Sequence, residues 1–387
     1  MTATVAIGRL VDAVEKVDPV RVWPGGTFSY VDIAAVDQAS KAIVQPQQVD
    51  SSDAPSRARQ LICAGDILVS TVRPNLNAVA LVPAQLDGAV ASTGLSVLRP
   101  RAEVLDYRYL FHWVRSPPFV SEMTRRATGA SYPAVSDAIV KASEVPLPPI
   151  EEQRRIAAVL DEADELRAKR QSSAVLLGVL VRSIFLEMFG HPAENPRKLP
   201  TTTLGELAEW RSGGTPPRSE ARFFLGSVPW FSSGELGPVF IESSTECVSE
   251  EAIRQTSAKE VPAGSLMLGM YDTAALKSSI AVQRCSCNQA VAFASIPTDV
   301  ASTRFVHAAI QVGREFYRSK QRGVRQKNLN LSMVRSLEIP LPSIEDQARF
   351  ESLARAVDSQ CRRALEHAAT ISDLRSSLQH RAFAGQL

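Results

Sequence analysis

One short motif in the sequence has the residue types needed to hold a nucleic-acid base. Ser116-Pro117-Pro118-Phe119 matches the [DNS]-P-P-[YFW] pattern with which base-modifying enzymes hold an extruded base and its amino group. Such enzymes also need a glycine-rich cofactor loop after a strand, but the chain has no F-x-G-x-G. The residues before Ser116 are typical of a helix, so we interpret the prolines as a turn that interrupts two helices. No catalytic residue is predicted.

Other kinds of chemistry have even less support in the sequence. There is no G-x-x-x-x-G-K-[ST] loop, which argues against a nucleotide-driven motor. Acidic residues and lysines show no nuclease-like spacing, and the five histidines are dispersed. The five cysteines include no Cys-x-x-Cys pair, so neither a metal site nor a disulfide scaffold is expected. This cysteine usage favours a reducing, cytoplasmic location.

Basic residues offer a better-supported function, although the net charge is only +2. Arg314, Arg318 and Arg322 recur every four residues and would share one helix face. Such a face is either simply solvated or a track for DNA phosphates. Each half of the chain carries a basic cluster: Arg99, Arg101, Arg108, Arg115, Arg125 and Arg126 in the first, and Arg304, Arg314, Arg318, Lys320, Arg322, Arg325 and Lys327 in the second.

Sequence-specific DNA recognition also needs side chains that reach base edges, and loops supply candidates. The first half offers a turn around Pro74, and the second offers two loops rich in glycine, arginine and polar residues. The predicted DNA-binding residues are Arg73, Asn75, Asn77, Arg125, Arg126, Arg211, Arg218, Tyr271, Asp272, Lys277, Arg314, Arg318, Arg322, Arg325 and Lys327.

These candidates belong to two copies of one unit. Residues 145–153 read VPLPPIEEQ and residues 339–347 read IPLPSIEDQ, 194 positions later. At the same offset Phe189 matches Phe383, so the register holds without a gap over about sixty residues. We therefore predict an internal duplication.

Each repeat opens a long helix. No proline interrupts residues 151–189, and Gly190-His191-Pro192 ends the segment. About 40 residues would form a helix of about 60 Å. Its apolar seam should pack antiparallel against the other copy, although packing of each helix on its own domain is the alternative. The seam residues, predicted to serve the spacer and partner docking, are Ile156, Leu160, Leu177, Val181, Ile184, Phe350, Val357, Ile371 and Leu378.

Strand and helix patterns alternate loosely in the regions before the long helices. Strands are expected at 28–37, 64–82 and 91–100, with counterparts at 228–236, 263–273 and 287–297. We predict an α+β fold in which two α/β domains are separated by two long antiparallel coiled-coil helices. The segments are domain one (1–145), helix one (146–190), a linker (191–203), domain two (204–338) and helix two (339–387). No continuous apolar run approaches the ~18 residues of a membrane span.

In this arrangement the sequence resembles a type I restriction–modification specificity subunit. The paired P-L-P-x-I-E-[ED]-Q segments are similar to the family's conserved regions. SGGTPPRSEARFFLGSVPWFSSGEL (212–236) resembles the opening of its target recognition domains. GVRQKNLNLSMVRSLEIPLP (323–342) and TGASYPAVSDAIVKASEVPLP (128–148) resemble the passage from recognition domain to helix. The resemblance covers nearly the whole chain.

The resemblance implies a non-catalytic subunit whose two target recognition domains each bind half of a split double-stranded DNA site. It further implies that the helices dock methyltransferase subunits, expected to be two, and that restriction/translocase subunits join them. S-adenosylmethionine would be bound by the methyltransferase partner and no cofactor by this chain, and no membrane is involved. Two other hypotheses fit the same residues: a free-standing DNA-binding regulator, and an assembly scaffold that does not touch DNA.

Overall fold

The computed structural model describes residues 3–129, 131–319 and 328–387, which form two compact units. The first unit comprises Met1–Arg170 with Glu366–Leu387, and the second comprises Gln171–Leu365. Each unit thus holds one α+β domain together with half of each long helix. The predicted boundaries treated the helices as separate segments, whereas each half-helix belongs to the core of its unit.

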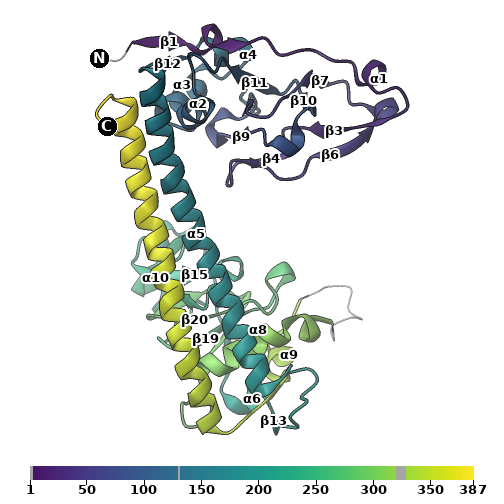
Figure 1. The fold of residues 1–387 in the computed structure, drawn as a ribbon. Helices are drawn as coiled ribbons and strands as arrows, with labels where there is room; N and C mark the ends of the chain where they lie inside the picture. The colour runs from purple at the N-terminus through teal and green to yellow at the C-terminus, as the bar shows by residue number, and fades with distance from the viewer. Residues whose placement is uncertain (1–2, 130, 320–327) are drawn as a thin grey trace. The chain divides into compact units, whose positions relative to one another are not determined.

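The two long helices are present as predicted. Helix α5 (Ile150–Phe189) and helix α10 (Ile344–Phe383) have 40 residues each and lie side by side in Figure 1. In the first unit the start of α5 shares a core with the end of α10, through Leu160 and Ala382. In the second unit the end of α5 meets the start of α10, where the Phe185 and Phe350 ring centroids are 5.5 Å apart. The helices therefore pair antiparallel, as expected.

The first domain is built on two four-stranded sheets, ordered β6-β3-β10-β7 and β2-β11-β8-β9. Strands β1 and β12 form a separate antiparallel pair, as do β4 and β5. Its strands are β1 (Thr4–Ala6), β2 (Val11–Asp12), β3 (Thr27–Val31), β4 (Val36–Asp37), β5 (Ala42–Ile43), β6 (Gln47–Asp50), β7 (Ala58–Leu61), β8 (Ile67–Ser70), β9 (Val79–Leu81), β10 (Val90–Ser92), β11 (Leu95–Pro100) and β12 (Glu144–Pro146). Its helices are α1 (Pro19–Val22), α2 (Tyr107–Val114), α3 (Pro117–Arg126) and α4 (Asp137–Ala142), with 3-10 turns η1 (Ile7–Arg9), η2 (Ser51–Asp53), η3 (Pro74–Leu76) and η4 (Ala84–Leu86).

The second domain repeats this plan. Its sheets are ordered β17-β15-β21-β18 and β14-β22-β19-β20-β16, and β13 pairs with β23. Its strands are β13 (Thr201–Thr203), β14 (Arg211–Ser212), β15 (Val228–Phe231), β16 (Phe240–Ile241), β17 (Glu246–Val248), β18 (Glu260–Val261), β19 (Leu266–Gly269), β20 (Ser278–Ala281), β21 (Cys285–Cys287), β22 (Val291–Ala294) and β23 (Glu338–Pro340). Its helices are α6 (Leu204–Leu207), α7 (Glu250–Gln255), α8 (Thr303–Ser319) and α9 (Leu331–Arg335), with η5 (Ala221–Phe224), η6 (Ser233–Glu235) and η7 (Asp272–Ala274).

The correspondence extends to strand direction, because β3 pairs parallel with β10, just as β15 does with β21. One predicted strand was too long, however. The segment 28–37 leaves the sheet at Val31, where the Asp32 carboxylate accepts a hydrogen bond from the Ala35 amide at 2.9 Å and makes a turn. Only Val36–Asp37 resumes as β4.

A buried glutamine from each repeat joins domain to helix. In the first unit the Gln153 carboxamide accepts a hydrogen bond from the Asp106 amide at 2.9 Å and donates to the carbonyls of Val104 and Pro148. In the second unit Gln347 accepts from the Ser302 amide at 2.9 Å and donates to the Pro342 carbonyl. Both glutamines are 1% exposed. The retained glutamine therefore ties the first turn of each long helix to the start of α2 or α8.

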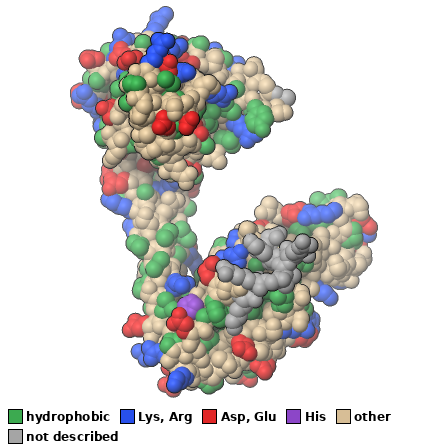
Figure 2. Space-filling model, turned by 90° about the vertical axis from the view of Figure 1, so that its right-hand side faces the viewer, with side chains coloured by type: hydrophobic (Ala, Val, Ile, Leu, Met, Phe, Trp, Pro, Cys, Tyr) green, Lys and Arg blue, Asp and Glu red, His purple; other side chains and the backbone are tan. Residues whose placement is uncertain are grey.

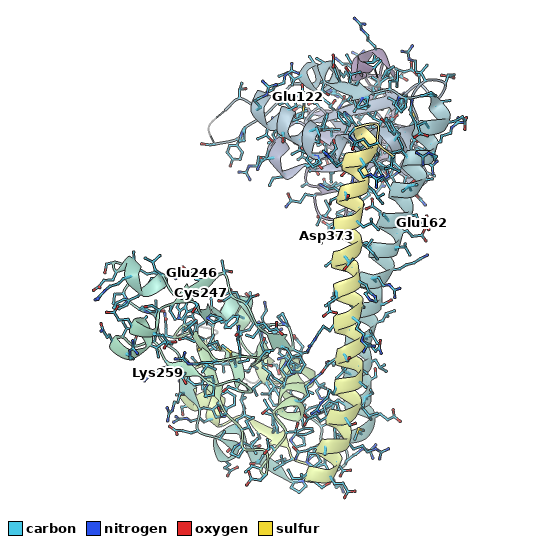
Figure 3. The ribbon with its side chains drawn as sticks, turned by 90° about the vertical axis from the view of Figure 1, so that its left-hand side faces the viewer. Glu122, Glu162, Glu246, Cys247, Lys259 and Asp373 are labelled. Atoms are coloured by element: carbon cyan, nitrogen blue, oxygen red, sulfur yellow. The ribbon has the colours of Figure 1, made fainter. Side chains whose placement is uncertain are left out.

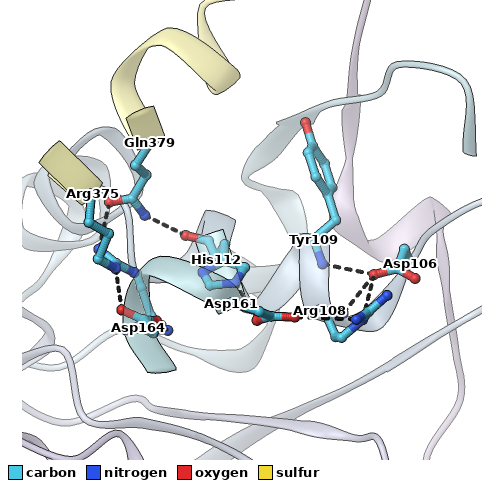
Figure 4. Close-up of polar contacts among 9 residues, drawn as sticks. Asp106, Arg108, Tyr109, His112, Asp161, Asp164, Arg375 and Gln379 are labelled. Carbon is cyan, nitrogen blue, oxygen red and sulfur yellow. Dashed lines mark hydrogen bonds and ion pairs between the residues drawn. The ribbon is translucent and has the colours of Figure 1, made fainter. Parts of the chain in front are cut away.

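An ion-pair network adds to this joint in the first unit (Figure 4). Asp161 of α5 pairs with Arg108 and is hydrogen-bonded to the buried His112 of α2, whose Nε2 lies 2.8 Å from the carboxylate. One turn along α5, Asp164 pairs with Arg115 at 2.8 Å and with Arg375 of α10 at 2.5 Å. The network links the domain to both helices, and its arginines are mostly buried. Such pairs are costly to break because the remaining charge stays desolvated.

We expect Asp164→Ala to lower the free energy of unfolding of the first unit by about 3 kcal/mol, since Arg115 and Arg375 would lose their shared carboxylate. Urea unfolding followed by circular dichroism measures this loss. The matched control is Glu162→Ala on the same helix, where the acid is exposed (Figure 3) and should contribute less than about 0.5 kcal/mol. Equal effects of the two variants would contradict the role of the network.

Candidate nucleic-acid interface

Three of the predicted DNA-contacting residues of the first domain, Arg73, Asn75 and Asn77, lie on one β-hairpin. Strands β8 and β9 pair antiparallel, and the turn between them contains η3. Arg73 and Asn77 flank this turn, both in the left-handed backbone region with φ of 50° and 48°. Arg73 and Asn75 are exposed at the tip, whereas Asn77 is half-buried. The hairpin thus exposes the first two residues to solvent.

Asn77 itself is engaged within the protein, which corrects its prediction as a base-contacting residue. Its side-chain amide donates to the Val114 carbonyl at 2.9 Å, and its Oδ1 accepts from Lys41 Nζ at 3.1 Å. Burial, and then the charges of Arg115 and Arg375, lowers the pKa of Lys41 to about 8. Asn77 therefore anchors the hairpin to the end of α2 and does not offer its amide to DNA.

The second domain carries the equivalent hairpin, formed by β19 and β20 around η7. Tyr271 and Lys277 lie at its two ends and are both half-buried, and Tyr271 packs against the core. The side chain of Asp272 lies outside the described part of the structure. Helix α8 contacts this turn through two side chains. Gln311 donates to the Leu276 carbonyl at 2.8 Å, and Arg314 donates to the carbonyls of Ala275 and Thr273.

Arg314 was predicted to contact phosphate, but in the structure its guanidinium bonds to carbonyls of the β19–β20 turn and so positions that turn. The predicted phosphate contact by Arg318 stays a prediction; its side chain is half-buried at the end of α8. The predicted contacts Arg322, Arg325 and Lys327 lie outside the described residues. The structure thus has equivalent hairpins in the two domains, β8–β9 and β19–β20. Each is hydrogen-bonded to the equivalent domain helix, α2 in the first domain and α8 in the second.

Comparison with known protein families identifies this paired arrangement. A model described as the type I restriction modification DNA specificity domain matches residues 23–176 and again residues 196–359. The chain belongs to this family. Each match covers most of one α+β domain and runs into the helix that follows it, so the family's unit coincides with the internal duplication.

Individual relatives agree with the family assignment. The specificity subunit of the type I restriction enzyme EcoR124I/EcoR124II from Escherichia coli is 28% identical over 163 residues, which cover 41% of this chain and 40% of that subunit. The HindI specificity subunit from Haemophilus influenzae is 22% identical and covers 76% of this chain and 80% of its own length. A solved structure from work on complex assembly and conformational transition of the type I restriction–modification system covers 100% of this chain and 98% of its own, with 27% identity and a TM-score of 0.62.

Several predicted DNA contacts of this specificity-family member are already paired with acids. Arg126 pairs with Glu122 at 3.0 Å, and Arg211 with Glu209 at 3.1 Å. Arg218 makes a two-pronged pair with Glu246 and lies over the Phe224 ring at 4.5 Å. Exposed pairs of this kind are weak and can be exchanged for a phosphate. Arg125 is exposed on the last turn of α3.

The basic clusters are less available for DNA than their composition suggests. Arg99 pairs with the buried Asp66 at 2.7 Å, and Arg108 and Arg115 belong to the network on α5. In the second domain Arg304 pairs with Asp358 of α10 and is only 7% exposed. Arg99 is thus engaged inside its own domain, whereas Arg108, Arg115 and Arg304 join a domain to a long helix. Part of each basic cluster is therefore structural.

The predicted docking residues also need correction. Ile156, Leu160, Val181 and Phe350 are buried in the cores of the two units, and Ile184, Val357 and Leu378 pack against those cores. Leu177 and Ile371 are half-buried. As seam residues they hold the helices, and for that reason most of them cannot contact a partner.

Exposed apolar residues on another face of α5 were missed by the seam analysis (Figure 2). Val175 and Leu176 are each 69% exposed, Val179 is 55% and Leu180 is 45%. The signal was available in the sequence, since eight consecutive apolar residues at 174–181 point around the whole helix and cannot all face one seam. We call Val175, Leu176, Val179 and Leu180 the α5 apolar face.

The same segment changes one expectation about hydropathy. Although no long apolar run exists, α5 contains a window with mean hydropathy 1.7, which is long and apolar enough to cross a membrane by length and composition alone. Only 22% of that window is buried. Core helices pass the same test, so this is weak evidence for a membrane, but it marks apolar surface that a binding partner could cover.

The Ser116-Pro117-Pro118-Phe119 motif fits the structural interpretation. The prolines occupy the first two positions of α3, where a missing backbone N–H is tolerated. Phe119 is 1% exposed and packs in the domain core, so its ring is not free to stack on a base. Within the described residues there is also no group of three or more potential metal-ligating side chains.

Variants of Asn77 and Asn75 should distinguish a residue that anchors the hairpin from one that is exposed at its tip. Asn77→Ala removes the bonds to Val114 and Lys41 and places alanine at a positive φ, so we expect a loss of about 2 kcal/mol in the free energy of unfolding. Faster amide exchange at Ser70, which pairs across the hairpin, should accompany it. Asn75→Ala is the control and should leave both quantities unchanged. A stable hairpin in the Asn77 variant would refute the anchoring role.

Proposed function

We propose that this chain supplies the DNA sequence specificity of a type I restriction–modification complex, with each of its two domains reading one half of a bipartite site. The observation that carries the proposal is the repeated hairpin, braced by α2 in one specificity domain and by α8 in the other. Two similar reading surfaces with different side chains suit two different half-sites. Phosphate contacts would set their register, and hairpin side chains would read base edges.

Catalysis is assigned to partners. Methyltransferase subunits would bind S-adenosylmethionine and modify the bases that this chain selects, and restriction/translocase subunits would join the same complex. The chain itself would contribute no catalytic group. Its five cysteines are free thiols, which supports the cytoplasmic location that we propose for the complex.

The α5 apolar face supports docking of a methyltransferase subunit. Complete burial of a valine or leucine side chain contributes about 1.5–3 kcal/mol, so four such residues could contribute substantially to an interface. Val175 and Val179 lie four residues apart on one helix face, as do Leu176 and Leu180. An apolar helical face with few charges is suited to another apolar helix.

The central test is the methylation pattern. When the chain is expressed with its methyltransferase partner in a host without competing methylation, methylome sequencing should reveal a motif of two defined parts separated by unspecified bases. Replacing the hairpin-tip residues Asn75 and Leu76 by Ala should relax one part only, because the second domain retains its own hairpin. The control is Arg21→Ala with Val22→Ala, on the exposed helix α1.

A single continuous motif, or equal loss of both parts in the hairpin variant, would contradict two-domain reading. Tight specific binding by the chain alone would instead favour a free-standing DNA-binding protein. Binding of partners without any sequence-dependent DNA contact would favour a scaffold.

Docking has a separate test. Val175→Ser with Val179→Ser should weaken binding of the methyltransferase subunit at least tenfold, since it removes exposed apolar surface without changing the buried seam. Calorimetry or co-purification measures the loss. Leu225→Ser is the matched control: this leucine is 81% exposed in the second unit but does not lie on either long helix. Equal binding by both variants would place the interface elsewhere.

A further inference from the structure

At the tip of the first hairpin, an exposed arginine contacts an exposed tyrosine from the segment after α3, and nothing in the sequence connects the two residues. The guanidinium carbon of Arg73 lies 4.8 Å from the centre of the Tyr132 ring. The tyrosine is 69% exposed, the largest exposed aromatic surface among the described large hydrophobic residues. Arginine stacked on tyrosine is a favourable cation–π contact, and both side chains lie on the surface.

The backbone holds both residues firmly in place. The Arg73 amide donates to the Pro133 carbonyl at 2.7 Å, Val72 bridges to Ala134, and the Val135 amide donates to Thr71 at 2.8 Å. Arg73 adopts φ of 50°. A left-handed conformation is unfavourable for a non-glycine residue and persists only where the surroundings impose it. The hairpin and the segment that carries Tyr132 therefore form one rigid support for the arginine.

Arg73 also differs from the paired arginines of the candidate interface. Arg126, Arg211 and Arg218 each contact a glutamate. For Arg73, no ion pair and no side-chain hydrogen bond is present within residues 3–129, 131–319 and 328–387. One face of its guanidinium covers the tyrosine ring, which leaves the N–H edge available. That edge is the part of arginine that makes two parallel hydrogen bonds.

A guanine presents the matching acceptors in the major groove. Its O6 and N7 accept two hydrogen bonds from one arginine, the commonest base-specific contact in protein–DNA complexes. A phosphate could also accept them, but it needs no fixed plane, whereas the edge of a base does. Stacking on Tyr132 fixes the guanidinium plane before DNA arrives, which reduces the entropy lost on binding.

We propose that Arg73, oriented by Tyr132, reads a guanine in the half-site bound by the first domain. Arg73 is the base-contacting residue and Tyr132 is a positioning residue. This inference rests on the proposed function, because it assumes that the first domain reads one half of a bipartite DNA site.

The test uses the complete complex of the chain with its methyltransferase subunit. Binding is measured on duplexes in which each base pair of the two half-sites is changed in turn, at several salt concentrations. For Arg73→Ala we expect the preference for G·C at one position of one half-site to fall about 10- to 100-fold, with the other half-site unaffected. Arg73→Lys should also lose most of this preference while keeping overall affinity, since lysine lacks the planar two-pronged edge.

Variants of the tyrosine test its positioning role. Tyr132→Phe keeps the ring and should retain the preference, whereas Tyr132→Ala should reduce it several-fold. Tyr107→Ala is the matched control, because this tyrosine is 42% exposed at the far end of α2 from Asn77. Unchanged discrimination in Tyr132→Ala would overturn the positioning role.

Two results would overturn the guanine assignment. If Arg73→Ala weakens binding equally for every sequence and lowers the salt slope by about 1, the arginine contacts a phosphate. If the preference at every position survives, Arg73 does not read DNA. A wild-type complex without any two-part motif would instead reject the proposed function, so the two failures can be told apart.

Discussion

A buried carboxamide at the start of each long helix is the contact on which the architecture depends. Gln153 and Gln347 each satisfy backbone groups from two separate segments, namely the start of the domain helix α2 or α8 and the proline-rich stretch before the long helix. An apolar residue there would leave those buried groups unpaired, and an acid would lose the donor half of the contact. This side chain and the stiff prolines before it therefore fix the first turn of each long helix on its domain.

The two copies keep this joint but stabilise the rest of their helix contacts with different chemistry. In the second unit the end of α5 contributes Phe185 and Phe189 to an aromatic cluster with Phe305 and Phe350. The matching positions of α10, 194 residues later, include Gln379 in place of Phe185. Gln379 donates to the His112 carbonyl at 2.8 Å and accepts from Arg375. At this pair of equivalent positions, one copy therefore uses an aromatic contact and the other uses hydrogen bonds.

The sequence alone predicts the features that local patterns encode, but not those that depend on contacts between distant residues. The long helices, their antiparallel pairing and the matching strands were predictable, because a gapless repeat and a heptad pattern are local signals that survive in the residues themselves. Roles that depend on long-range contacts were not. The sequence predicts that Asn77 contacts a base. In the fold, however, its side chain is hydrogen-bonded to Val114 and Lys41, both of which are distant in sequence. The seam residues were predicted as a docking surface because the heptad pattern identifies apolar residues. It does not show which face of the helix the domain core covers. Tyr132 gave no signal, since only folding brings it next to Arg73.

The repeated joint has an evolutionary consequence. Because β12 with α5 and β23 with α10 use the same proline-rich stretch and the same glutamine contact, a break within either repeat would separate the chain at equivalent points. Recombination between such sequences would therefore join a foreign domain to a helix that already has the matching glutamine contact. New binding preferences could then arise in a single genetic step, with no need for the helices or the surfaces they present to adapt.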